Sequence, residues 1–375
     1  MQIETIDVFH VALPLVEPPA SATGLSDVLQ TVLVRIQSEG LAGWGEASPG
    51  NAPRLSEEWA AGAFQCIRDW LAPALANSAV DTAGDLQQRL AVFQGNRYAK
   101  AALDGAWWDL EARRQGKPLY QLIGGSQTAI EVGPTFDQME TIDELLEALH
   151  KAVKAGFPRI GLKFRPGWDV QMLNLVRHEF PTEAIHIDCE AGLRLEHMEM
   201  LCRLDDFHLA MIEQPLPADD LVGHAMIQET IRTPLCLDEG VTTVEQADMA
   251  MELHSCQFVK IEPGRVGGLT KGMAIDETCH ENCHPCWVGM VPQSTIGMRT
   301  ALCLASRQNF SYPADYLDMA AMLTTDVGPV LSPSASENDG KQRIALWSEP
   351  GIGFEPDLAL VERLSRAKAS VSVSE

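Results

Sequence analysis

The first 45 residues carry hydrophobic and polar side chains in the short alternating runs that are typical of β-strands. Residues 3–8 alternate with a period of two, and residues 29–36 form a second run that is rich in β-branched side chains. A turn signal at Glu39-Gly40 leads into a third run at residues 40–46. The pattern predicts a small antiparallel sheet.

Residues 55 to about 118 are instead rich in Ala, Leu and Trp, and they predict helices. Small residues within 98–110 allow one such helix to lie close to its neighbours. Strands followed by helices indicate an α+β module, which we place at residues 1–125. Residues 326–375 return to loop, short strand and a terminal helix, and we expect them to pack back on this module.

Residues 126–325 have a different texture, in which short hydrophobic runs alternate with helical stretches. The expected strands are residues 130–134, 159–164, 185–188, 210–213, 235–238, 258–262 and 286–289. An eighth element is expected within residues 309–316. Seven or eight such units in a row predict an α/β fold, a (β/α) barrel of the TIM type, with the α+β module as a cap. The alternative is an open doubly wound sheet, which the lack of a Gly-rich phosphate loop after any strand disfavours.

Composition and charge narrow the classes of function. The 375 residues are 46% hydrophobic and carry a formal net charge of −24. Such an acidic chain repels polyphosphates, which argues against a nucleic-acid or anionic-membrane partner. No apolar run approaches the roughly 20 residues of a membrane span, and the N-terminus lacks the basic segment of a signal peptide. Nine scattered cysteines favour free thiols, so we expect a cytoplasmic enzyme that acts on a small molecule.

Three of the expected strands end in an acid, and these acids are spaced evenly. They are Asp188, Glu213 and Asp238, which lie 25 residues apart. Because the carboxyl ends of barrel strands open on one face, the three side chains should converge there. Carboxylates that converge repel one another unless a cation joins them, and oxygen ligands favour Mg²⁺, with Mn²⁺ as a second choice. The alternative is three unrelated surface acids at the starts of loops.

Two further strands carry lysines near their ends. Lys260 and Glu262 are two residues apart and share one face of their strand. Lys163 likewise shares a face with Gly161 and Arg165. A buried lysine beside a metal and other cations can act as a base near neutral pH. The alternative is a lysine that only forms a salt bridge at a strand end.

These residues, in this order and spacing, resemble the enolase superfamily. The resemblance is strongest to the o-succinylbenzoate synthase and N-succinylamino acid racemase branch of its muconate-lactonizing subgroup. It is carried by Asp188, by residues 213–216 (EQPL), by Asp238-Glu239 and by residues 263–268 (PGRVGG), with support from residues 102–110, 122–125 and 166–169. It covers nearly the whole chain.

The resemblance implies a barrel under a cap that the C-terminal residues complete. It also implies that Asp188, Glu213 and Asp238 bind Mg²⁺, and that the shared step is removal of a proton α to a carboxylate through an enediolate. In this family two lysines flank the α-carbon. One comes from a Lys-x-Lys motif on the second strand and the other from the sixth strand.

The chain departs from this family pattern at the lysines. Gly161 stands at the first lysine of the Lys-x-Lys motif, whereas Lys163, the usual proton-transfer residue, is kept. Glu262 stands at the sixth-strand lysine, and Lys260 lies about 6.6 Å deeper along that strand. We therefore expect Lys163 to act as the base, and either Glu262 or Lys260 to replace the missing lysine.

Two further departures from the family pattern concern the pocket. Glu190 replaces an expected asparagine, and Gln293 replaces an expected acid beside Ser294. The loss of the two family lysines and the gain of Glu190 and Glu262 should weaken the binding of a dianionic substrate, unless Arg165, Lys260 or a loop cation supplies the missing charge. We expect Gln293 and Ser294 to face the pocket. The residues that discriminate between substrates are expected on cap loops near 17–25 and 50–56.

The favoured activity is an o-succinylbenzoate synthase-like syn dehydration, which would serve menaquinone biosynthesis and needs only Lys163 as both base and acid. The alternatives are a racemase or epimerase of N-acylamino acids, a muconate-type cycloisomerase, and a barrel that binds metal but has lost catalysis. The substrate partner is a small carboxylate, and formation of a homo-oligomer is left open.

One further motif competes with this assignment. Cys279, Cys283 and Cys286 have the Cys-x3-Cys-x2-Cys spacing of an iron–sulfur site in radical enzymes, which are also barrels. The motif spans a helix end and a strand start, at the end of the barrel opposite to the active face. We therefore expect it not to hold a cluster, nor zinc.

Overall fold

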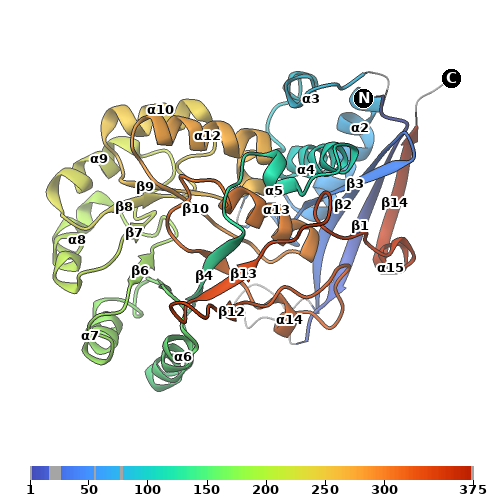
Figure 1. The fold of residues 1–375 in the computed structure, drawn as a ribbon. Helices are drawn as coiled ribbons and strands as arrows, with labels where there is room; N and C mark the ends of the chain where they lie inside the picture. Colours follow the sequence, from blue (N-terminus) through green and yellow to red (C-terminus); the bar gives the residue numbers. More distant parts are fainter. Residues whose placement is uncertain (1, 17–26, 55, 77–78, 373–375) are drawn as a thin grey trace.

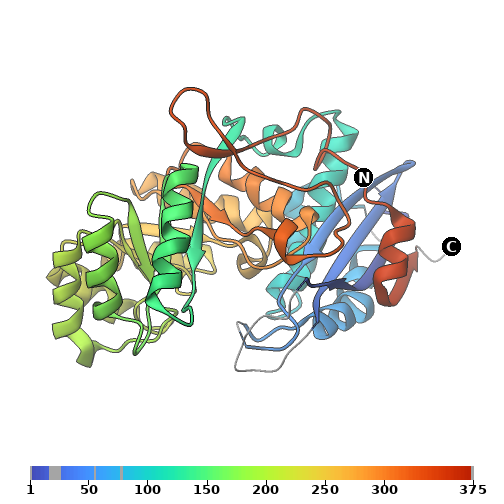
Figure 2. The same cartoon turned by 90° about the horizontal axis from the view of Figure 1, so that it is seen from below.

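The computed structural model describes residues 2–16, 27–54, 56–76 and 79–372. Two parts lie side by side, an α+β part that contains both chain ends and a barrel of alternating strands and helices (Figure 1). The view from below separates the same two parts (Figure 2). The exact domain boundaries at residues 125 and 325 stay a prediction.

A four-stranded antiparallel sheet forms the base of the α+β part, in the order β14-β1-β2-β3. Strand β1 (Thr5–Pro14) pairs with β2 (Val28–Ser38) on one side and with β14 (Ser365–Ser372) on the other. Strand β3 (Leu41–Ala47) pairs with the outer side of β2. The last strand of the chain therefore lies beside the first.

The helices of this part follow the sheet in the sequence. They are α1 (Ala60–Cys66), the π-helical turn η1 (Ile67–Leu71), α2 (Ala72–Ala76), α3 (Ala83–Leu90), α4 (Arg97–Arg114) and α5 (Leu119–Leu122). Helix α4 lies directly on β3, where a Cβ at Gly45 would be 2.0 Å from the carbonyl oxygen of Ala102. A Cβ at Gly43 would be 2.2 Å from the carbonyl oxygen of Ala106, so glycine is what lets the two backbones approach this closely.

Eight parallel strands make up the barrel. They are β4 (Ala129–Phe136), β5 (Ile160–Lys163), β6 (Ile185–Asp188), β7 (Ile212–Glu213), β8 (Leu235–Leu237), β9 (Phe258–Ile261), β10 (Cys286–Val288) and β11 (Ala314–Tyr316). Each pairs with the next from β4 to β10, and β11 pairs with β4. Phe310, just before β11, bridges Cys286 of β10. The predicted (β/α) barrel is therefore confirmed, and the eighth strand lies within the expected segment.

Helices and turns follow these strands. They are α6 (Ile142–Ala155), α7 (Val170–Glu179), η2 (Leu195–His197), α8 (Met198–Leu204), η3 (Asp205–Phe207), α9 (Leu221–Thr230), α10 (Val244–Leu253), α11 (Pro263–Val266), α12 (Leu269–Glu281), α13 (Thr295–Ala305), α14 (Met319–Met322) and α15 (Leu358–Leu364). Thr141 and Thr243 start α6 and α10 in the same way, because each side chain accepts a hydrogen bond from the backbone N–H three residues later. In a hairpin of β12 (Ser334–Ala335) and β13 (Gln342–Ala345), β13 pairs with the first residues of β4, 129–131. None of the helices in the described ranges has the length and hydrophobicity needed to span a bilayer.

A buried carboxylate joins the cap to the barrel. Asp104 on α4 is fully buried and accepts hydrogen bonds from the backbone N–H of Thr270 at 3.0 Å and from its hydroxyl at 2.5 Å. The side chain of Gln87 donates a third hydrogen bond at 2.9 Å. Burial raises the pKa of Asp104 to about 6, although these hydrogen bonds oppose the shift.

This raised pKa predicts a pH-dependent stability. The folded-state pKa of about 6 lies above the roughly 3.9 of an unfolded aspartate, so the stability that protonation gives is full below about pH 4 and is lost as the pH rises through 6. Asp104→Asn removes this titration. Between pH 5 and pH 7 the free energy of unfolding of the parent should fall by about 1 kcal/mol relative to that of the variant, as measured by urea denaturation. Asp248→Asn, on the exposed side of α10, is the control, and parallel pH profiles for the parent and Asp104→Asn would contradict the assignment.

Candidate active site

Three acids lie at the ends of neighbouring barrel strands. Asp188 is the last residue of β6, Glu213 is the last residue of β7, and Asp238 directly follows β8. Asp188 and Glu213 are partners in the parallel register of their strands. All three are buried, with exposed fractions of 5%, 1% and 4%. The structure thus places the three predicted metal ligands on one rim of the barrel.

Lysine ammonium groups hold these carboxylates. Lys163 Nζ lies 2.7 Å from Asp188 Oδ2, and Lys260 Nζ lies 2.7 Å from Glu213 Oε1 and 3.4 Å from Asp238 Oδ2. Within the described ranges, no three His, Cys, Asp or Glu side chains are arranged so that they could hold a metal ion as they stand. The oxygens are of the class that Mg²⁺ prefers, but ammonium groups now bind them.

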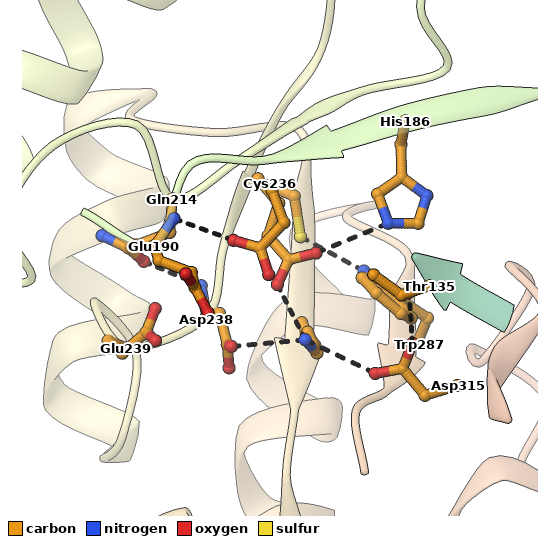
Figure 3. Close-up of polar contacts among 12 residues, drawn as sticks. Thr135, His186, Glu190, Gln214, Cys236, Asp238, Glu239, Trp287 and Asp315 are labelled. Carbon is orange, nitrogen blue, oxygen red and sulfur yellow. Dashed lines mark hydrogen bonds and ion pairs between the residues drawn. The ribbon is translucent and has the colours of Figure 1, made fainter. Parts of the chain in front are cut away.

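Lys260 reaches this rim from inside the barrel. Its Nζ also lies 3.5 Å from Asp315 Oδ2 and 5.0 Å from the centre of the Trp287 ring, and only 11% of the side chain is exposed. Gly289 gives it room, because a Cβ there would lie 2.3 Å from Lys260 Cε. Asp238, Asp315 and Trp287 come from three different parts of the barrel to this cluster (Figure 3).

The acids of the cluster differ in their readiness to ionise. Burial and the neighbouring Asp188 raise the pKa of Glu213 well above its usual value, against the opposing effect of Lys260. Burial also acts to raise the pKa of Asp238, but Arg265, which donates to this carboxylate, and Lys260 outweigh it and leave the pKa lowered.

Lys163 is more accessible than Lys260, with 23% of its side chain exposed. Besides Asp188 it contacts Glu190 Oε1 at 2.7 Å, and Arg165 Nη2 lies 3.1 Å from the other oxygen of Glu190. Burial acts to lower the pKa of Lys163, but Asp188 and Glu190 outweigh it and leave the pKa raised. The structure therefore favours the ammonium form.

Gly161 leaves space that a histidine fills. A Cβ at Gly161 would lie 2.4 Å from Thr135 Oγ1 and 2.8 Å from Nε2 of His186 on the adjacent strand. His186 is fully buried, and burial together with Arg159 lowers its pKa well below the usual value, so the ring is neutral. The position of the absent first lysine is therefore packed against a neutral imidazole.

Polar residues that the sequence analysis did not identify lie beneath the rim. Arg159 Nη2 lies 2.6 Å from Asp315 Oδ1, and His186 Nδ1 lies 3.2 Å from the hydroxyl oxygen of Tyr312. Arg159, His186 and Asp315 are almost fully buried. The signal that could have found them is a charged or ring-nitrogen side chain inside otherwise hydrophobic strands.

Glu262 has its carboxylate engaged by neighbours. Its oxygens accept hydrogen bonds from the Tyr98 hydroxyl at 2.6 Å and from the backbone N–H groups of Gly264 and Arg265 at 2.8 Å. Tyr98 belongs to α4, so Glu262 both begins helix α11 and contacts the cap. Its role as the opposite base stays a prediction.

Ser294 and Gln293 lie where the cap meets the barrel. Ser294 donates to Glu46 at the end of β3 through its backbone N–H at 2.9 Å and through its hydroxyl at 2.5 Å. Gln293 is buried and lines one small cavity with Glu46, Tyr98 and Glu262. The expectation that both side chains face the substrate pocket stays a prediction.

The remaining predicted features are only partly described. Residues 17–25 and residue 55 lie outside the described residues, so the substrate-discriminating role of the two cap loops stays a prediction. Cys279 and Cys286 are buried, whereas Cys283 is exposed. The expectation that the three thiols hold neither a cluster nor zinc stays a prediction.

The contact between Gly161 and His186 predicts an energetic coupling. Gly161→Ala should lower the free energy of unfolding by about 1–3 kcal/mol, because the methyl group has no room. Removing the ring with His186→Ala should relieve the part of this strain that comes from His186, whereas the contact with Thr135 Oγ1 at 2.4 Å remains. The double variant should therefore be more stable than the sum of the single effects by more than about 0.5 kcal/mol. Gly84→Ala in helix α3, where the nearest atom is Thr82 Oγ1 at 3.5 Å, is the tolerated control. Additive effects in urea denaturation would show that the two positions are independent.

Comparison with known proteins agrees with this architecture. The family described as Mandelate racemase / muconate lactonizing enzyme, N-terminal domain, matches residues 3–124, and the family Enolase C-terminal domain-like matches residues 144–360. An o-succinylbenzoate synthase from Geobacillus kaustophilus is 34% identical over 98% of this chain and 96% of that protein. An N-succinylamino acid racemase from Amycolatopsis sp is 32% identical over 98% of this chain and 99% of that protein.

A solved structure has the same overall architecture as this chain. A member of the enolase superfamily from Enterococcus faecalis superposes with a TM-score of 0.91 at 30% identity, over 99% of both chains. The predicted family and enzyme class are confirmed: the chain belongs to the enolase superfamily, a family of metal-dependent lyases and isomerases.

Proposed function

We propose that this chain removes a proton from the carbon α to a substrate carboxylate, in an o-succinylbenzoate synthase-like syn dehydration that serves menaquinone biosynthesis. The observation that carries the proposal is the placement of Lys163. It ends β5 in register with Asp188 at the end of β6, with its Nζ 2.7 Å from that carboxylate. A lysine at the mouth of the barrel is thereby fixed beside the acids while it stays partly accessible to a small molecule.

Asp188, Glu213 and Asp238 are the residues that would hold Mg²⁺, or Mn²⁺. Their carboxylate oxygens suit a hard divalent cation, and their burial on one rim of the barrel brings three such donors to the same place. When bound, the ion stabilises the negative charge that develops on the substrate carboxylate as the α-proton leaves. The oxygens must first be released by the ammonium groups that bind them in the free chain.

Lys163 serves as the base, and in a syn dehydration it also returns the proton to the leaving hydroxyl on the same face. Two lysines contact the acids, and Lys163 has the more exposed side chain of the two. Asp188 and Glu190 fix its ammonium nitrogen from two sides. They therefore orient the nitrogen, which can receive the α-proton only as the neutral amine, after it has lost the proton that these two acids stabilise.

A one-base reaction fits this arrangement better than a two-base reaction. Racemisation needs a second group on the opposite face of the α-carbon, and Glu262 stands at that position in the sequence. Its oxygens are engaged by Tyr98 and by two backbone N–H groups. This engagement favours dehydration over the alternative of an N-acylamino acid racemase, which the Amycolatopsis relative motivates. A muconate-type cycloisomerase and a non-catalytic barrel are further outcomes of the tests below.

The role of Lys163 is tested by hydrogen exchange. The parent should incorporate solvent deuterium at the α-carbon of a synthase substrate or of one member of a panel of N-acylamino acids. Lys163→Ala should slow this incorporation by about 10²–10⁴-fold, because a positioned general base typically contributes that much. Mass spectrometry measures the exchange, and a cooperative thermal unfolding transition shows that the variant is folded. Exchange at the parent's rate in Lys163→Ala would overturn the assignment, and no exchange by the parent on the whole panel would favour the non-catalytic barrel.

Glu262→Gln separates the two activities. If the protein is a one-base dehydratase, this variant should keep most of the parent's rate of exchange, because the one amide oxygen of glutamine can still accept from the Tyr98 hydroxyl and the Arg265 N–H, which share one oxygen of Glu262. Only the hydrogen bond from the Gly264 N–H loses its acceptor, since the amide nitrogen of glutamine cannot accept it. If Glu262 is the opposite base, the variant should lose exchange for one enantiomer of a chiral substrate and keep it for the other. Exchange measured separately on the two enantiomers decides between these outcomes.

A further inference from the structure

A buried ammonium group lies between the acids at the centre of the barrel mouth. Lys260 Nζ lies within 4.0 Å of three carboxylates, at 2.7 Å from Glu213, 3.4 Å from Asp238 and 3.5 Å from Asp315. These acids come from β7, the residue after β8, and β11, whereas Lys260 comes from β9. One side chain thus links four parts of the barrel.

The number of carboxylates around the Lys260 ammonium is that expected around a bound cation. A lysine ammonium has three N–H donors and no acceptor, and here three carboxylates surround it. Buried carboxylates that share a site repel one another unless a cation lies between them. Lys260 therefore supplies within the chain the positive charge that a bound cation would otherwise supply.

The surrounding structure is built around this lysine. Its side chain is 11% exposed, so the group does not reach in from the surface. It packs over the face of Trp287, 5.0 Å from the ring centre, and over Gly289, where any Cβ would collide with it. Both neighbours hold the ammonium at the level of the acids.

We propose that Lys260 is a built-in cation that competes with the divalent metal for the oxygens of Glu213 and Asp238. The proposal rests on the metal-binding role proposed above for Asp188, Glu213 and Asp238. The ammonium and the metal ion need the same oxygens, and two cations a few ångströms apart repel each other strongly in a buried site. Metal binding therefore requires Lys260 to leave the cluster, and the chain binds Mg²⁺ more weakly than its acids alone would.

The test measures metal binding and does not depend on catalysis. Mn²⁺ is the probe, since its free ion gives an electron paramagnetic resonance signal that decreases on binding. The parent is titrated beside Lys260→Asn and beside Lys151→Asn at constant ionic strength. Lys151 is the matched control, because it loses the same charge from an exposed ion pair with Glu147 on α6.

We expect the parent and Lys151→Asn to saturate only at about millimolar free Mn²⁺. Lys260→Asn should bind one Mn²⁺ at least about tenfold more tightly, because a nearby positive charge has been removed. Adding Asp238→Asn to Lys260→Asn should weaken binding again by at least about tenfold, since a charged ligand has been removed. This pattern would support both Lys260 as the competitor and the acids as the ligands.

Other outcomes overturn the proposal. Affinities of the parent and Lys260→Asn that agree within about twofold, whether tight or weak, would show that Lys260 does not compete. If Lys260→Asn fails to fold, the near-isosteric Lys260→Met replaces it. The parent alone also tests the proposal, because one Mn²⁺ bound by the parent with a Kd below about 10 µM would overturn the competition. Tight Mn²⁺ binding by the parent would contradict the competition but would still agree with the proposed metal ligands. Failure of α-proton exchange would contradict the proposed function but would not affect the competition.

Discussion

Pairing of buried charges at the mouth of the barrel is the interaction on which the arrangement of the site depends. Asp188, Glu213 and Asp238 are each at least 95% buried, and unpaired carboxylates in such places would strongly destabilise the fold. Each is in contact with a cation, from Lys163, Lys260 or Arg265. The pairs fix both the carboxylates and the lysines, so the same contacts that stabilise the barrel set the positions of the groups that would do chemistry.

The overall fold was predictable because it depends on local patterns. Buried parallel strands appear as short hydrophobic runs, and seven or eight such units in succession indicated the barrel. The acids were predictable for the same reason, because Asp188 and Glu213 end their strands and Asp238 follows its strand directly. The position of each acid in the sequence was enough to place its backbone at the rim formed by the carboxyl ends of the strands.

Side-chain direction was less predictable, because it depends on partners that are distant in the sequence. Lys260 and Glu262 share one face of a strand, which suggested that both point into the same pocket. Glu262 instead contacts Tyr98, which lies 164 residues earlier, and the N-terminus of the helix that it begins. Lys260 has a long flexible side chain that spans the depth between its strand position and the acids. A pattern of alternation fixes a face, but it does not fix how far a side chain reaches.

The departures from the family pattern belong together physically. The lysine that is absent at Gly161 leaves a space that His186 fills, and Gly289 leaves the space that Lys260 crosses. Positive charge inside the barrel comes instead from Lys260 and Arg159, which both contact Asp315. The partly exposed cations on the rim strands are then Lys163 and Arg165, and Glu190 accepts contacts from both. If Lys163 is the proposed base, a substrate carboxylate that approaches it competes with Glu190 for the same two cations. We therefore expect Glu190 to disfavour some anionic substrates before any proton is transferred.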